Sequence, residues 1–189
     1  MHFDLACPFS YLALERVDRL LEGVRWRPTC GDALHRGDPW ADLGGTAARV
    51  AAERRARELR LPLVWPPQNP APAQGAMRAA HYAAEVKRGG EFALAAARLA
   101  FCGGFDLEDP EVLAEAAAAA GIPLDACLQA ARDPGRDAQL EHAGRRLLAA
   151  GADRLPVVRV GRVLYCGEQG VAQAAAVRRA PARRGAGVA

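Results

Sequence analysis

The sequence contains no pair of cysteines at Cys-x-x-Cys spacing. Its five cysteines are odd in number and far apart along the chain: Cys7, Cys30, Cys102, Cys127 and Cys166. A disulfide framework needs paired cysteines, and a structural zinc site needs closely spaced ligands. Neither pattern is present, so the sequence predicts reduced thiols and no metal site.

Long apolar segments are also missing. No apolar run approaches the roughly 20 residues that span a bilayer, although 51% of the 189 residues are hydrophobic. The chain enters a short apolar stretch at once, without the basic region and apolar segment of a secretory signal. This pattern excludes a membrane-spanning segment and predicts no membrane partner. The length suits one large domain, or a domain with an insertion, and a cytoplasmic location is the default expectation.

The body of the chain lacks an excess of positive charge. The formal net charge is +3, and four arginines follow the last acidic residue, Glu168. These arginines are Arg178, Arg179, Arg183 and Arg184. Without them, 21 basic residues face 22 acidic ones. Nucleic-acid binding requires a basic face with a recognisable reading element, so the sequence predicts no nucleic-acid partner.

What the sequence does contain is a cysteine between a predicted strand and a predicted helix. Pro8 directly follows Cys7 and favours the first position of a helix. Apolar residues then recur at helical spacing, at Leu14, Val17, Leu21 and Val24. Unpaired N–H groups and the positive end of the helix dipole stabilise a thiolate here, which predicts a lowered pKa and a reactive Cys7. The alternative is that Cys7 is a small buried apolar residue.

Ser10 follows Cys7 by three residues, one helical turn further along and on the same side. Its hydroxyl can form a hydrogen bond with the sulfur of Cys7, but it cannot form a disulfide. We therefore expect Cys7 and Ser10 to form the reactive part of a site.

The rest of the chain predicts a second strand, a long series of helices, and a final hairpin and helix. Alternation of apolar and polar residues predicts a strand over 24–28, and a Gly- and Pro-rich stretch predicts a loop over 30–43. Helical patterns, one of them ending at Gly89-Gly90, cover 47–59, 74–88, 91–102, 110–120, 124–132, 136–150 and 170–178. Strands at 157–160 and 162–165 flank Gly161 as a hairpin. Five prolines within 61–72 predict an irregular crossing, with a proline-rich ligand for a partner as the alternative.

This order of elements is that of the thioredoxin fold with a helical insertion. The predicted class is therefore α/β. A thioredoxin-like domain comprises 1–30 and 151–178, helices of the insertion and its links occupy 31–150, and a basic tail covers 179–189. The first unit should be parallel and right-handed, and the final hairpin antiparallel. Leu155-Pro156 precedes the third strand, where thioredoxin-like folds carry a cis-proline opposite the helix-terminal cysteine.

The sequence resembles the DsbA-related family that includes 2-hydroxychromene-2-carboxylate isomerase and the kappa-class glutathione transferases. The resemblance runs over most of the chain. It rests on the segments 4–13 (DLACPFSYLA), 61–63 (LPL), 76–80 (AMRAA), 109–113 (DPEVL), 151–156 (GADRLP) and 165–169 (YCGEQ). The first and the last two of these segments are the functional motifs.

The resemblance implies a role for each motif. Position 7, usually serine in the family, hydrogen-bonds the sulfur of glutathione. Leu155, before the cis-proline Pro156, offers its backbone to the cysteinyl part of that cofactor. Gly167 and Glu168 lie against its γ-glutamyl end, with Glu168 in place of the usual aspartate.

Two departures from the family pattern bear on the activity. Family members often carry a lysine and a tyrosine before the basic helix, where this chain has only small residues and a threonine over 44–48 (GGTAA). In addition, cysteine replaces serine at position 7. A cysteine there resembles the DsbA branch, but that branch has a second cysteine where this chain has Ser10.

Three classes of function follow from these features. One is an isomerase or transferase that uses glutathione or another small thiol and acts on a small aromatic substrate. The second is a DsbA-like thiol–disulfide oxidoreductase with a single cysteine, which needs an external thiol to release a mixed disulfide. The third is a binding module without catalysis, because fold does not fix function. The resemblance also implies a homodimer.

Overall fold

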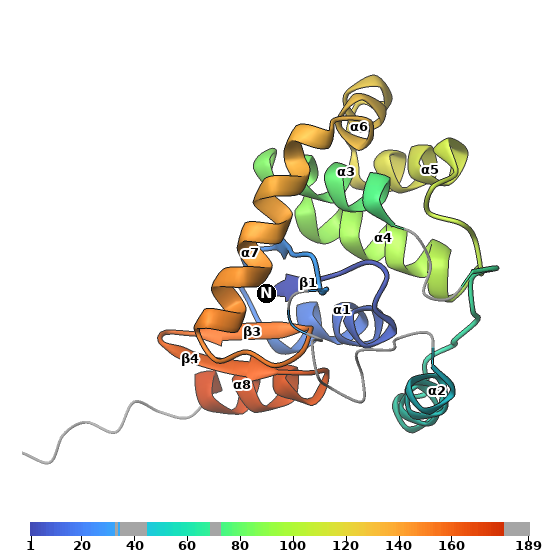
Figure 1. The fold of residues 1–189 in the computed structure, drawn as a ribbon. Helices are drawn as coiled ribbons and strands as arrows, with labels where there is room; N and C mark the ends of the chain where they lie inside the picture. The colour runs from blue at the N-terminus through green and yellow to red at the C-terminus, as the bar shows by residue number, and fades with distance from the viewer. Residues whose placement is uncertain (33, 35–44, 69–72, 180–189) are drawn as a thin grey trace, which may run out of the picture.

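The sheet of the protein consists of four short strands drawn from both ends of the sequence (Figure 1). This computed structural model describes residues 1–32, 34, 45–68 and 73–179. The strand order is β2-β1-β3-β4, with β1 at His2–Phe3, β2 at Arg27–Pro28, β3 at Val157–Val160 and β4 at Val163–Cys166. β1 and β2 are parallel, and the β1–β3 and β3–β4 pairs are antiparallel. The predicted parallel unit and final hairpin are therefore confirmed.

Helices make up most of the remaining structure, and their order matches the predicted α/β arrangement with a helical insertion. They are α1 (Pro8–Leu20), α2 (Thr46–Leu59), α3 (Gln74–Glu85), α4 (Gly89–Phe101), α5 (Pro110–Ala120), α6 (Leu124–Ala131), the 3₁₀ turn η1 (Pro134–Arg136), α7 (Asp137–Ala149) and α8 (Gln169–Arg179). The predicted helices are thus confirmed to within a few residues. Of the predicted tail, only Arg179 lies within the described residues, and most of the predicted loop 30–43 lies outside them.

The two faces of the sheet are covered by different helices. Successive residues of a strand point to opposite faces. Val157 packs in a small cluster with Leu147 of α7, whereas Val158 belongs to the main core together with Val171 of α8. Buried residues of α1 join the same main core. The sheet therefore lies between α7 on one side and α1 with α8 on the other. Because α1 follows β1 in the chain, the helix begins near the edge of the sheet where β1 ends.

Gly89 and Gly90 do not end a helix, as the sequence suggested, but begin α4. The reason is close packing against Trp26. A Cβ atom on Gly90 would lie 2.5 Å from Nε1 of Trp26, and one on Gly89 would lie 3.0 Å from Cβ of Trp26. The same indole packs edge-on against Phe3. β2 comprises two residues, Arg27–Pro28, instead of the five predicted.

The proline-rich crossing joins α2 to the rest of the molecule. Its described part, 61–68, has no regular secondary structure, as predicted, and 69–72 lie outside the described residues. The hydroxyl of Tyr11 donates to the carbonyl of Pro62 at 2.7 Å, and Trp65 donates from Nε1 to Glu53 of α2 at 2.9 Å. The Arg49 guanidinium lies 4.7 Å from the centre of the Trp65 ring. These contacts place the prolines against α1 and α2, where the segment acts as a packed connection.

Candidate active site

Two loops that are far apart in the sequence meet at one edge of the sheet. β1 leads into the loop that carries Cys7, and β3 begins directly after Leu155-Pro156, whose peptide bond is cis as predicted. His2 pairs with Val157 in antiparallel register, so the next residues, Phe3 and Pro156, are also neighbours. The N–H of Gly167 donates to the carbonyl of Pro156 at 2.8 Å. The structure therefore brings together the end of β1, the cis-proline and the residue after β4.

Cys7 is the N-cap residue of α1, with Pro8 at the first helical position. Its exposed fraction is only 1%. The pKa of this thiol is raised to about 11, chiefly by burial. The nearby Asp4 carboxylate also raises the pKa, while the N–H groups of Ser10 and Phe9 and the Ser10 hydroxyl offset part of the rise.

The predicted lowering of the Cys7 pKa is therefore wrong. A helix N-terminus stabilises a thiolate by a modest amount, whereas removal of that charge from water opposes ionisation more strongly. The position of Cys7 at the start of a helix was visible in the sequence. The burial of its side chain depends on residues that are distant from Cys7 in the chain. The structure supports both sequence interpretations in part, because Cys7 stands at the helix terminus and is also buried.

Ser10 lies beside Cys7 as predicted and is fully buried. Its hydroxyl oxygen accepts a hydrogen bond from the backbone N–H of Asp4 at 3.2 Å. The hydroxyl proton remains free to point toward the sulfur, where it favours the thiolate. Ser10 thus connects the start of the loop with the sulfur of Cys7.

Asp4 is a residue of the site that the sequence analysis did not single out. One carboxylate oxygen accepts from the N–H of Ala6 and the other from the N–H of Gly31, both at 2.9 Å. Burial raises the pKa of Asp4, these two N–H groups lower it, and Asp32 raises it. The Asp4 side chain therefore fixes the Cys7 loop and ties it to the segment after β2. An aspartate two residues before its N–H partner is typical of an Asx turn, and this was the available signal.

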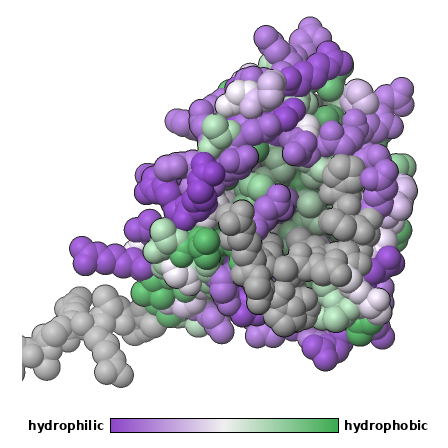
Figure 2. Space-filling view, in the orientation of Figure 1, coloured by the Kyte–Doolittle hydropathy of each residue, from purple (hydrophilic) through white to green (hydrophobic). Residues whose placement is uncertain are grey.

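The helical insertion also contacts the loop. The backbone N–H of Leu5 donates to the sulfur of Met77, on α3, at 3.3 Å. Figure 2 shows an apolar recess over α3 and α4, bordered by hydrophilic residues. The insertion therefore contacts the Cys7 loop through Met77.

Glu168 is buried directly before α8 and holds two arginines. Its carboxylate pairs with Arg16 of α1, and its other oxygen accepts from Nε of Arg55 of α2 at 2.5 Å. Gly167 precedes it with a φ of +76°, which favours glycine. The implied contact of Glu168 with a γ-glutamyl group stays a prediction, but both carboxylate oxygens already have protein partners.

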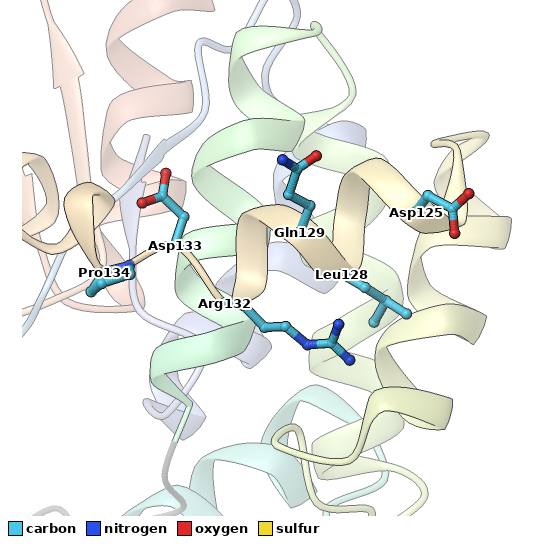
Figure 3. A pocket seen from close by; sticks show the side chains of 6 residues that line it. All are labelled: Asp125, Leu128, Gln129, Arg132, Asp133 and Pro134. Atoms are coloured by element: carbon cyan, nitrogen blue, oxygen red, sulfur yellow. The ribbon is translucent and has the colours of Figure 1, made fainter.

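A further cavity, of about 530 Å³, lies on the surface of α6 and η1 (Figure 3). It is lined by Asp125, Leu128, Gln129, Arg132, Asp133 and Pro134. None of the predicted site residues belongs to it. Among the described residues there is also no group of three or more His, Cys, Asp or Glu side chains arranged to hold a metal ion. No helix in the described ranges is long and apolar enough to cross a membrane.

Comparison with known proteins identifies the family. Residues 1–177 match the model of the DSBA-like thioredoxin domain, and no curated protein matches. A solved structure of 2-hydroxychromene-2-carboxylate isomerase is similar with a TM-score of 0.74 at 15% identity, covering 94% of this chain and 92% of that one. A probable DsbA oxidoreductase from Streptomyces coelicolor has a TM-score of 0.66 at 20% identity, covering 96% and 91%. At these identities the two structures show a shared fold, and the family match over nearly the whole length shows that this chain belongs to the DsbA-like thioredoxin family.

Proposed function

We propose that this protein is an isomerase that uses a small thiol of the glutathione type and acts on a small aromatic acid with a conjugated double bond. The observation that carries the proposal is the state of Cys7. Burial raises its pKa to about 11, so its sulfur is a neutral thiol near neutral pH. A neutral thiol donates a hydrogen bond but is a poor nucleophile. Cys7 is therefore better suited to hydrogen-bond the sulfur of a bound thiol than to attack the substrate.

A bound small thiol, held by Cys7 and the backbone of Leu155, would supply a nucleophilic sulfur for reversible addition to the conjugated bond, with the same sulfur released and no net oxidation. The residues of the chain hold and orient the bound thiol. The S–H of Cys7 donates to the sulfur of the bound thiol, and its proton stays on Sγ throughout. Ser10 and Asp4 fix the loop that carries this donor.

The backbone of Leu155 fits a peptide-like thiol. In the part of the chain that the structure describes, neither its N–H nor its carbonyl has a hydrogen-bond partner. One free donor and one free acceptor match the donor and acceptor of a cysteinyl unit, as in the addition of a strand to a sheet edge. Glu168 fits less well, because an ammonium group would have to displace Arg16 or Arg55. These two arginines instead favour a carboxylate of the ligand.

The apolar recess over α3 and α4 supports a substrate with an aromatic body (Figure 2). The similarity in fold to 2-hydroxychromene-2-carboxylate isomerase makes a hydroxychromene carboxylate the substrate to test first. Both features agree with an isomerase that binds its substrate between the sheet edge and the helical insertion.

A thiol–disulfide oxidoreductase is the second candidate, and the sulfur at position 7 favours it. In that function Cys7 itself attacks a disulfide, which requires an accessible thiolate. The 1% exposure of Cys7 and the raised pKa oppose this, and Ser10 cannot resolve a mixed disulfide. A protein disulfide would need a larger displacement of the residues around Cys7 than a small thiol needs.

Replacement of Cys7 tests the proposal. Cys7→Ser keeps a hydrogen-bond donor and should retain most of the isomerase activity with a hydroxychromene carboxylate and glutathione, whereas Cys7→Ala should lose it. In the oxidoreductase function both variants would be inactive toward a disulfide substrate. Loss of isomerisation in a folded Cys7→Ser protein contradicts the proposal. Inactivity of the unmodified protein in both assays points to a binding module.

A further inference from the structure

A small cleft lies between the second half of α1 and the end of α2. Its volume is about 210 Å³, and it is lined by Glu15, Arg16, Arg19, Leu20, Leu59 and Leu61. Arg16 is shared with the candidate active site, where it pairs with Glu168, and the other five residues are not part of that site. Glu15 follows Cys7 by eight residues, which corresponds to about 12 Å along a helix. The cleft therefore lies beside the Arg16–Glu168 pair, on the same helix that begins at Cys7.

The charged groups of the cleft leave one positive charge unpaired. Glu15 is neutralised by Arg98, whose Nε and Nη2 donate to its two oxygens at 2.6 and 2.7 Å. Arg16 pairs with Glu168 through one nitrogen, so its other N–H groups remain available. Arg19 is exposed and has no hydrogen-bond or ion-pair partner in the described ranges. The cleft thus presents guanidinium donors from two arginines to a ligand.

The rest of the lining is apolar. Leu20, Leu59 and Leu61 are only half-buried, although all three pack against the main core. Apolar side chains that remain half in water gain free energy when a ligand covers them. A volume of about 210 Å³ is below the roughly 300 Å³ at which pockets for drug-sized ligands begin. The ligand must therefore be small.

We propose that this cleft binds a small organic carboxylate with an apolar body, such as a benzoate-sized acid. The carboxylate lies against Arg19 and the free N–H groups of Arg16, where charge-assisted hydrogen bonds form. The apolar body covers Leu20, Leu59 and Leu61. Because the lining comes from both sides of the cleft, the bound acid joins α1 to α2.

Titration with sodium benzoate, followed by amide NMR and calorimetry, tests this site. Benzoate should shift the amide signals of Leu20, Leu59 and Leu61 in a saturable manner. Benzamide, which lacks the charge, and acetate, which lacks the apolar body, should each bind about tenfold more weakly or worse. Cys7→Ser should bind benzoate like the unmodified protein, which separates this site from the proposed active site.

Arg19→Gln is the decisive variant, because Arg19 is exposed and its replacement leaves the core intact. It should weaken benzoate binding by about tenfold or more. Arg162→Gln, an equal change of charge in the exposed β3–β4 turn, should have no effect. The proposal is overturned if both variants lose binding equally or if Arg19→Gln binds benzoate unchanged. It is also overturned if the amide shifts are confined to the loop around Cys7, or if millimolar benzoate gives no saturable binding.

Discussion

The backbone N–H of Asp4 donates to the hydroxyl oxygen of Ser10 across the turn that contains Cys7, at 3.2 Å. This hydrogen bond closes the loop from both sides. The oxygen that accepts it belongs to the same hydroxyl that acts on the sulfur. The geometry of the loop and the protonation of Cys7 therefore depend on one buried side chain.

Ser10→Ala should affect both properties. It leaves the partly buried N–H of Asp4 without this partner, which costs up to about 1–3 kcal/mol of unfolding free energy. It also removes a group that favours the thiolate, so the pKa of Cys7 should rise further. Urea unfolding and the pH dependence of Cys7 alkylation measure the two effects. Thr46→Ala, which removes an exposed hydroxyl at the start of α2, is the control and should change neither.

Cys7 should be among the slowest of the five cysteines to react with iodoacetamide at neutral pH. Only the thiolate reacts, and burial both raises the pKa of Cys7 and blocks access to it. The half-buried Cys102 and Cys166 are the internal comparison. Mass spectrometry of the labelled peptides gives each rate. Rapid labelling of Cys7 at pH 7 contradicts the protonated, buried thiol on which the proposed function rests.

The protein should lose stability at alkaline pH. Burial raises the pKa values of Cys7 and Cys127 from 9.0 to about 11. The stabilising contribution of such a neutral thiol is complete below the unfolded value and decreases as pH rises from 9 toward 11. Each fully buried thiol should contribute about 2 kcal/mol to this loss. Denaturant unfolding at a series of pH values measures it, and Cys7→Ser should make the decline shallower. An equally steep decline in Cys7→Ser assigns the effect to other groups.

Glu168→Gln should loosen α2. The neutral side chain leaves Arg16 and Arg55 close together without a compensating charge, and loss of one partner from a buried ion pair is destabilising by up to about 3–5 kcal/mol. Both arginines are partly exposed, so we expect about 1–3 kcal/mol after screening by solvent. Amide hydrogen exchange in α2 should become faster.

Glu58→Gln is the matched control for this change, because Glu58 is half-exposed and also pairs with Arg55. It should have little effect on exchange in α2. Unchanged exchange in Glu168→Gln means that α2 is held by its apolar contacts and by Trp65 alone.

The parts of the structure that the sequence predicted are those set by local rules. Pro8 after Cys7 identified the start of α1, and Gly161 identified the hairpin. The helical pattern over 110–120 coincides with α5, which Asp109 caps at its start and Gly121 ends. Side-chain oxygens at a helix start and glycines at its end act within a few residues. The cis bond before Pro156 was expected only because the order of elements placed it opposite Cys7.

The parts that the sequence did not predict depend on tertiary packing. Gly89-Gly90 has the pattern of a helix end, yet it lies under Trp26, which is distant in the sequence. The partners of Glu168 come from α1 and α2, and no local pattern indicates that two arginines converge on it. Burial of Cys7 is of the same kind. Each error thus concerns a residue whose neighbours are far away along the chain.

The pairing of His2 with Val157 has a consequence for how the molecule acquires its site during folding. The two strands are separated by nearly the whole helical part of the chain, so the contact closes a very long loop. The entropy lost on closure grows only slowly with loop length, but contacts of such large sequence separation make folding slow. The helices between them can form from local contacts first. During synthesis β1 therefore emerges before these helices, and its pairing with β3 waits until they have been made.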